Sequence, residues 1–331
     1  MKKLLATATI ALGLSAGGAM AWECGDITMA EFNWASGELM ANIDKFILEE
    51  GYGCDVSLVI GGTTAIFASM NEKGTPQIAG EQWVNALREL LDPAIAEGRL
   101  HAVNSAPIMG LGEGWWIPPY TAAAHPELKT VLDWIEHPEL FPSAEDPSKG
   151  AFVGCPAGWG CQHVNLNLFE AFDMEAKGWV LIDPGSAAGL DGSIAKANER
   201  EENWLGYYWS PTSIIGKYNM QAVPWGVDFA GNENWDTCIS QEECSDPQQT
   251  SWIQSEVFTI VTDEFMQSGG EINDYLAARV FTSESMGAML VYMADEQAAG
   301  EDAAIEFLIQ YEDLWTTWVS DEVAAKVKAA L

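Results

Sequence analysis

The chain has 331 residues and a formal net charge of −34, from 49 acidic and 15 basic side chains. A chain this negative repels phosphate, which argues against nucleic-acid and anionic-membrane partners. Its length is enough for a large hydrophobic core and predicts two domains. The charge fits either solubility in a salty medium or a field that attracts cations, and screening by salt favours the first interpretation.

The first 21 residues have the three parts of a secretory signal peptide. Lys2 and Lys3 carry positive charge, an apolar run covers 4–14, and residues 19–21 form an A-x-A cleavage site. The apolar run is shorter than a helix that spans a bilayer. We therefore expect cleavage after Ala21 and a soluble, periplasmic mature protein.

The next hundred residues alternate between strand and helix patterns. Ser36, followed by an acidic residue and an apolar stripe, is expected to cap the first helix. This alternation predicts an open, mostly parallel sheet, in which ligands bind beyond the carboxyl ends of the strands. Trp34 and Trp83 fall at such strand-to-helix turns. Strands are expected at 27–34, 56–60 and 77–79, and helices at 36–51, 65–70 and 83–91.

The middle of the chain has an α/β pattern of its own, between two expected chain crossings. The segment 110–120 is rich in Gly and Pro and is expected to form the first crossing, while a strand at 257–261 returns to the first domain. The tail is expected to be helical. Two crossings between two α/β lobes predict a clamshell, with one lobe formed by 22–114 plus 256–331 and the other by 115–255.

Six cysteines fit an oxidising compartment and fall into three pairs by spacing. Six cysteines allow fifteen connectivities, so the pairing by spacing is a hypothesis. A zinc site is disfavoured because the C-x-x-C spacing is missing and the four histidines are scattered. The expected bridges are Cys24–Cys54, Cys155–Cys161 and Cys238–Cys244.

Tryptophan is unusually frequent, with 15 copies in the chain, and several copies lie next to Gly, Pro or another aromatic residue. A tryptophan on a loop presents a rigid, electron-rich face, and a desolvated quaternary ammonium group is a good partner for such a face. The sequence therefore predicts an aromatic cage for a small methylated ammonium compound. The clearest examples of this placement are Trp83, Trp115, Trp116, Trp159 and Trp209.

Two motifs resemble those of the substrate-binding proteins of osmoprotectant ABC importers, which take up glycine betaine, proline betaine and choline. The segment 154–161 reads G-C-P-A-G-W-G-C, and 207–211 reads Y-Y-W-S-P. The resemblance covers nearly the whole mature chain. It implies a type II-like periplasmic binding protein with two open, mostly parallel sheets flanked by helices, and a membrane permease as partner.

The resemblance also implies which tryptophans surround the ligand. In the family, the disulfide-closed loop carries one cage tryptophan, the place of Trp159, and the Y-Y-W-x-P stretch carries a second, the place of Trp209. Trp83 takes the place of a third, and Trp34 resembles one used in the choline-binding branch. Trp115 and Trp116 are further candidates, with packing between the lobes as the alternative.

Two acidic residues next to the expected cage bear on the choice of ligand. Glu81 lies two residues before Trp83, and Glu113 lies shortly before Trp115. A carboxylate at either place would repel the carboxylate of glycine betaine, and would suit choline or protonated trimethylamine N-oxide. We therefore favour trimethylamine N-oxide, with choline, glycine betaine and dimethylsulfoniopropionate as alternatives.

A catalytic function is disfavoured because the sequence lacks the G-x-S-x-G, HExxH and P-loop motifs. The alternative of a different class is a secreted carbohydrate-binding or carbohydrate-active protein, in which tryptophans form platforms for sugar rings and paired acids act on them. We expect a monomer that is not an enzyme and holds no cofactor and no metal.

Overall fold

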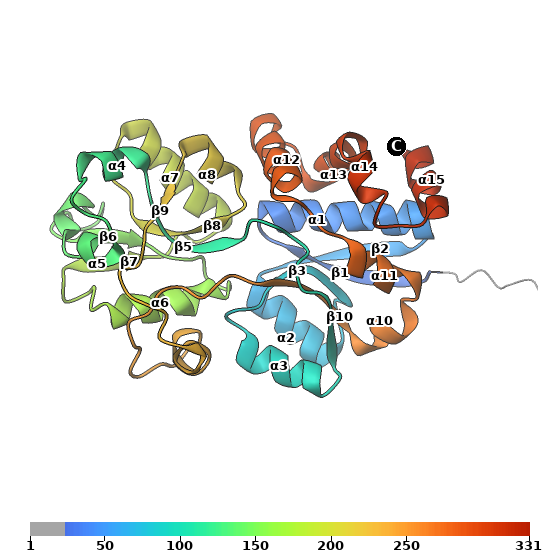
Figure 1. Ribbon diagram of the computed structural model, residues 1–331, viewed down its shortest axis with the longest axis horizontal. Helices are drawn as coiled ribbons and strands as arrows, with labels where there is room; N and C mark the ends of the chain where they lie inside the picture. Colours follow the sequence, from blue (N-terminus) through green and yellow to red (C-terminus); the bar gives the residue numbers. More distant parts are fainter. Residues whose placement is uncertain (1–23) are drawn as a thin grey trace, which may run out of the picture.

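The computed structural model describes residues 24–331, and within this range the chain forms two lobes side by side (Figure 1). Each lobe is built on its own five-stranded sheet. The expected signal peptide and its cleavage after Ala21 lie outside the described residues. No helix in 24–331 combines the length and the apolar character needed to cross a bilayer.

The first lobe has the strand order β2-β1-β3-β10-β4. Strand β1 runs parallel to β2 and β3, whereas β10 runs antiparallel to β3 and β4. The single antiparallel strand, β10, belongs to the segment that returns from the second lobe. The strands are β1 (Asp26–Phe32), β2 (Asp55–Gly61), β3 (Ile78–Trp83), β4 (Leu100–Asn104) and β10 (Val257–Thr262).

Helices cover both faces of this sheet (Figure 1). One face carries α1 together with the C-terminal helices α12 to α15, and the other carries α2 and α3. The helices of the lobe are α1 (Ala35–Phe46), the π-helix η1 (Ile47–Tyr52), α2 (Thr63–Lys73), α3 (Arg88–Ala96), α10 (Asp263–Ser268), α11 (Glu271–Ala278), α12 (Ser283–Glu296), α13 (Gly300–Gln310), α14 (Glu312–Trp315) and α15 (Asp321–Ala330).

The second lobe has the strand order β7-β6-β8-β5-β9, again with one strand, β5, antiparallel to its neighbours. Its strands are β5 (Gly112–Ile117), β6 (Gly150–Val153), β7 (Trp179–Ile182), β8 (Gly206–Ser210) and β9 (Gln221–Ala222). Its helices are α4 (Pro119–Ala124), α5 (Val131–Trp134), η2 (Pro138–Leu140), α6 (Cys161–Ala171), α7 (Ala187–Arg200), α8 (Ser213–Tyr218), α9 (Asn232–Asn234) and η3 (Trp235–Ile239).

The two mostly parallel sheets agree with the prediction, but two local details differ from it. The expected lobe boundary at 114/115 falls inside β5, so the first crossing lies between β4 and β5, at 105–111. The Gly and Pro residues around this strand are typical of a loop, so the β-forming run 115–117 was not recognised as part of a strand. Helix α1 begins at Ala35 after Trp34, and Ser36 does not cap it; its hydroxyl donates to Glu81 instead, at 2.9 Å.

All six cysteines pair as predicted. The Cys24–Cys54 bridge joins the segments that lead into β1 and β2, two neighbouring strands. The Cys155–Cys161 bridge closes a short loop between β6 and α6. The third bridge, Cys238–Cys244, closes a short loop at the end of η3.

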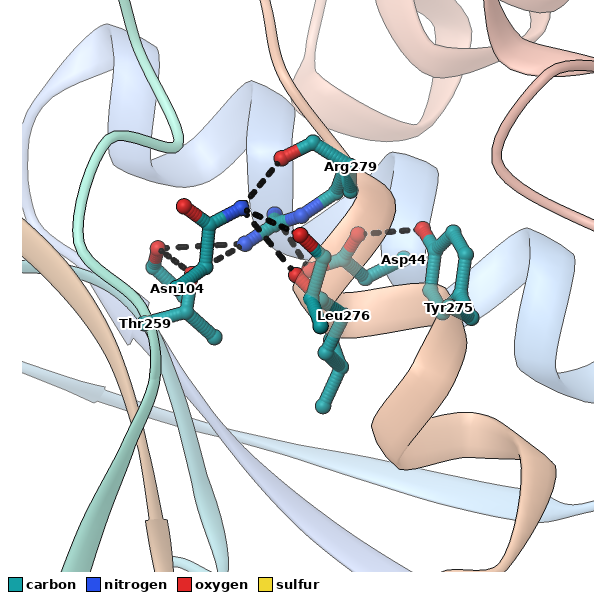
Figure 2. Close-up of polar contacts among 8 residues, drawn as sticks. Asp44, Asn104, Thr259, Tyr275, Leu276 and Arg279 are labelled. Atoms are coloured by element: carbon teal, nitrogen blue, oxygen red, sulfur yellow. Dashed lines mark hydrogen bonds and ion pairs between the residues drawn. The ribbon is translucent and has the colours of Figure 1, made fainter.

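A fully buried ion pair ties together four segments of the first lobe (Figure 2). Arg279 Nη1 donates to Asp44 Oδ2 at 2.7 Å, and both side chains have no exposed surface. Tyr275 donates its hydroxyl proton to the other oxygen of Asp44. Arg279 Nη2 donates to Thr259 Oγ1 at 2.7 Å and to Gly80 O at 3.2 Å. The network therefore fixes β3, the strand that carries Glu81 and Trp83, against α1 and β10.

Candidate ligand-binding site

A pocket lies between the two lobes, and six tryptophans line it. Trp34 and Trp83 come from the first lobe, and the others from the second lobe or the returning segment. The complete lining is Trp34, Thr63, Trp83, Asn85, Ala86, Glu113, Trp159, Gly160, Cys161, Val164, Tyr207, Trp209, Trp235 and Trp252. The four tryptophans expected in a cage, Trp34, Trp83, Trp159 and Trp209, are all among them.

The first-lobe wall is built where strands end. Trp34 follows β1 and Trp83 ends β3, and these two parallel strands are neighbours in the sheet. Each indole N–H donates to the same oxygen, Glu81 Oε1, at 2.9 Å from Trp34 and 3.0 Å from Trp83. Shared anchoring of this kind fixes the orientation of both rings before any ligand arrives.

Glu81 does not line the pocket, in contrast to its expected role as a ligand contact. Its carboxyl group instead accepts from the indole N–H groups of two pocket walls, Trp34 and Trp83, and the residue is 1% exposed. Burial raises the pKa of Glu81 to about 7, against the lowering effect of the hydrogen bonds from Trp34, Trp83 and Ser36. The second oxygen, Oε2, has no hydrogen-bond donor among the described residues.

Trp159 of the second lobe lies at steep angles to Trp209 and to Trp34 of the first lobe, so the three rings together form a corner of the pocket. Trp159 lies edge-on to Trp34, with ring centroids 5.1 Å apart and an interplanar angle of 72°. It is also edge-on to Trp209, at 5.1 Å and 84°. Rings set at such angles enclose a compact group on several sides, whereas flat sugar rings stack on open, parallel platforms.

The lobes touch across the pocket, so the structure is closed. Trp159 Nε1 donates to Asn33 Oδ1 of the first lobe at 2.9 Å. Thr64 Oγ1 donates to Gly158 O at 3.0 Å. A Cβ atom on Gly62 would lie 2.8 Å from that same carbonyl oxygen, so glycine permits the close approach there. The disulfide-closed loop is thus both a pocket wall and a contact that holds the lobes together.

Trp235, Trp252 and Tyr207 also line the pocket, although the sequence did not assign them to it. Trp235 starts η3 and donates its indole N–H to Asn85 O of the first lobe at 3.0 Å. Trp252 lies on the segment that returns to β10. Neither lies in a segment with a periodic apolar pattern, so only the tertiary structure reveals them. The position of Tyr207, two residues before Trp209 on β8, could have indicated that it shares a face with Trp209.

Glu113 is the acidic residue that lines the pocket. It accepts hydrogen bonds from the Tyr207 hydroxyl at 2.9 Å and from Ser255 Oγ at 3.1 Å. Burial nevertheless raises its pKa to about 7, against the lowering effect of these bonds. Among the described residues that line the pocket, none is Lys, Arg or His. The carboxyl group of Glu113 therefore faces the pocket without a basic partner.

Trp115 and Trp116, the further candidates for ligand contacts, do not line the pocket. Trp115 shares a face of β5 with Glu113 but lies deeper in the second lobe, fully buried against Phe152, and donates to Asn165 at 3.0 Å. Trp116 faces the other side of the sheet and donates to Tyr208 O. Both tryptophans are part of the lobe's own packing.

These features define a class of protein: a two-lobed receptor that closes around a small ligand in a tryptophan-lined pocket. Residues 25–310 match the OpuAC family, described as the substrate binding domain of ABC-type glycine betaine transport systems. The chain belongs to this family. Its members are solute-binding domains of transporters, so the protein is a substrate-binding protein of an ABC transport system.

Solved structures of similar fold agree with this family. A choline-binding protein of an ABC transporter, in complex with choline, has a TM-score of 0.72 at 15% identity, covering 93% of this chain and 98% of that one. The glycine betaine/L-proline-binding protein ProX of Borrelia burgdorferi gives 0.71 at 14%, covering 91% and 99%. Lactococcal OpuAC, closed and complexed with glycine betaine, gives 0.67 at 16%, covering 89% and 100%. No curated protein sequence matches the chain.

These likenesses confirm the predicted periplasmic binding protein fold. The family match also removes the support for the carbohydrate-active alternative, because the match extends over both lobes and includes the disulfide-closed tryptophan loop.

Proposed function

We propose that the protein binds a small trimethylammonium compound between its lobes, trimethylamine N-oxide in preference to choline and glycine betaine, and delivers it to a membrane permease. The tryptophan corner around Trp159, with Glu113 at the pocket wall, is the observation that carries this proposal. Two relatives in fold were solved with choline and with glycine betaine, ligands of the same chemical class. Three disulfides fit an oxidising compartment such as the periplasm.

The cationic end of the ligand fits the aromatic walls. Each desolvated contact between a methylated ammonium and an indole face contributes about 1–2 kcal/mol, so four walls contribute about 4–8 kcal/mol, a large share of the roughly −8 kcal/mol of micromolar affinity. Hydrogen bonds within the first lobe hold the indole rings of Trp34 and Trp83 independently of lobe closure, which lowers the entropy cost of ordering them.

The other end of the ligand is expected to meet Glu113 and Trp252. The buried indole N–H of Trp252 makes no well-aligned hydrogen bond within 24–331, although it lies near enough to Glu113 to lower the pKa of that acid. A ligand oxygen that accepts a hydrogen bond would satisfy this donor. An N-oxide oxygen can accept from Trp252 and from a protonated Glu113 together.

The part of the pocket around Glu113 disfavours the alternative ligands, glycine betaine, dimethylsulfoniopropionate and choline. Glycine betaine and dimethylsulfoniopropionate each carry a carboxylate, which would face Glu113 with no basic side chain among the lining residues. Choline has no carboxylate, and the ionised form of Glu113 would suit it best, as acceptor or counterion. Because the pKa of Glu113 is raised to about 7, the protonated form needed by the N-oxide is available near neutral pH.

Replacing Glu113 by glutamine tests this proposal, because an amide still donates a hydrogen bond but carries no charge. We expect Glu113→Gln to keep the affinity for trimethylamine N-oxide within about threefold and to weaken choline binding by about tenfold, the worth of one lost charge interaction. Calorimetric titration of both ligands against both proteins measures this. Asp191→Asn is the matched control, since Asp191 accepts from a tyrosine hydroxyl at 2.6 Å but does not line this pocket.

The pH dependence gives an independent check on the proton of Glu113. If protonated Glu113 donates to the ligand, affinity for trimethylamine N-oxide is full below about pH 7 and falls above it, where the acid ionises. Affinity is measured as a function of pH for wild type and for Glu113→Gln. Subtracting the two profiles separates the effect of Glu113 from that of other titrating groups. Affinity for trimethylamine N-oxide that instead rises with pH in this comparison would contradict protonated Glu113 as the donor to the ligand.

A further inference from the structure

Glu81 is placed to act on the pocket without touching its contents. Its Oε1 accepts three hydrogen bonds, from the indoles of Trp34 and Trp83 and from Ser36 Oγ, all between 2.9 and 3.0 Å. The first two donors are pocket walls, whereas Glu81 itself is not. The carboxyl group therefore lies directly behind the edges of two rings whose other surfaces face the ligand.

The charges around Glu81 leave it without a counterion of its own. Arg279 is the basic residue that acts on Glu81, and it also donates to the carbonyl of the preceding residue, Gly80. However, its guanidinium already forms an ion pair with Asp44 at 2.7 Å (Figure 2). One positive and two negative groups are thus buried together, and Glu81 Oε2 lacks a donor among the described residues.

We infer that Glu81 is a positioning residue that supplies negative charge to the cage through the indoles of Trp34 and Trp83, so that the trimethylammonium group of the ligand is its counterion. The inference rests on the proposed function. A carboxylate that accepts from an indole N–H pushes electron density toward the ring, which strengthens attraction of a cation to the ring face. The cation in turn offsets the cost of a buried, unpaired carboxylate.

The variant Glu81→Gln separates charge from geometry. The amide oxygen of glutamine takes the place of Oε1 and still accepts from both indoles. The NH₂ group takes the place of Oε2, which has no hydrogen-bond donor among the described residues. The rings therefore stay oriented while the charge is lost. Glu31→Gln is the matched control, because Glu31 lies on β1 of the same sheet and does not line the pocket. Unfolding midpoints of both variants, compared with wild type, check that folding is intact.

The probes are chosen to differ in charge at constant shape. Choline is compared with 3,3-dimethylbutan-1-ol, and trimethylamine N-oxide with tert-butanol, by titration or by competition. We expect Glu81→Gln to weaken choline about tenfold and its uncharged analogue less than about twofold. Equal losses for the two members of a pair, or choline affinity unchanged within twofold, would overturn the inference. Wild-type protein that binds neither ammonium compound would instead refute the proposed function.

The pH dependence of choline affinity distinguishes an electrostatic role of Glu81 from a purely structural one, because a structural role would not change with the charge of Glu81. In Glu113→Gln, the acid that lines the pocket is replaced by a neutral amide. Burial also raises the pKa of Asp44 and of Asp191, so the double variant with Glu81→Gln is needed to assign any remaining pH dependence to Glu81. Because ionised Glu81 favours a cation, choline affinity in this variant should rise as pH increases through about 7. The double variant with Glu81→Gln should show no such rise, and a flat profile in Glu113→Gln alone would contradict the inference.

Discussion

Replacing Trp159 by alanine is expected to weaken binding of a trimethylammonium ligand about tenfold or more, since one desolvated cation–π wall is worth about 2 kcal/mol. Trp159 stands at the corner of the cage, edge-on to both Trp34 and Trp209. Its N–H also bridges to Asn33 of the opposite lobe. Alanine therefore removes a wall, admits water and deletes a contact that holds the lobes closed. Calorimetric titration of the variant measures the loss.

The control for this prediction is a tryptophan of similar burial outside the pocket. Trp204 is 5% exposed, as is Trp159, and donates to Ser193 within the second lobe. The variant Trp204→Phe should bind ligand as the wild type does, even if it is less stable. Wild-type affinity in Trp159→Ala would show that the corner does not hold the ligand, and the proposed site would be wrong.

Replacing Arg279 by alanine is expected to lower the free energy of unfolding by about 3–5 kcal/mol, because it leaves an uncompensated buried charge. Arg279 and Asp44 have no exposed surface, and the guanidinium also donates to Thr259 and to Gly80 O. Its loss would leave Asp44 with the Tyr275 hydroxyl as its remaining partner in this network. Urea unfolding at pH 7 measures the change.

A surface ion pair provides the comparison for this stability prediction. Lys326 and Glu322 form a pair at 3.0 Å with side chains 52% and 80% exposed, and Lys326→Ala should change stability by less than about 1 kcal/mol. The double variant Asp44→Leu/Arg279→Met should be more stable than Arg279→Ala, because it removes both charges together. If Arg279→Ala unfolds at the same urea concentration as Lys326→Ala, the pair is not a structural anchor of the first lobe.

The sequence predicts best those features that depend on short stretches of chain. The alternation of strands and helices gave the mostly parallel sheets, and short spacings gave the Cys155–Cys161 and Cys238–Cys244 bridges. Trp34 and Trp83 were predicted at the pocket because the ends of neighbouring parallel strands meet at one sheet edge. The lobe boundary was misplaced because Gly and Pro around β5 resemble a loop.

The remaining features depend on contacts between distant residues. Trp235 reaches the pocket through a hydrogen bond to Asn85, which lies 150 residues earlier in the chain. Glu81 was expected to touch the ligand, whereas its carboxyl group accepts from three donors, Trp34, Ser36 and Trp83, that follow or end two different strands. Trp115 was assigned to the site from its neighbours in sequence, whereas its position along β5 buries it in the second lobe. No local pattern encodes these arrangements.

Calorimetric titration of the disulfide-bonded protein with trimethylamine N-oxide, choline, glycine betaine and dimethylsulfoniopropionate tests the central claim most directly. We expect affinity in the micromolar range, about −8 kcal/mol, for trimethylamine N-oxide, with weaker binding of choline and the weakest for the two carboxylate-bearing solutes. Tightest binding of glycine betaine would contradict the role assigned to Glu113. Absence of binding to all four compounds would contradict the tryptophan cage itself.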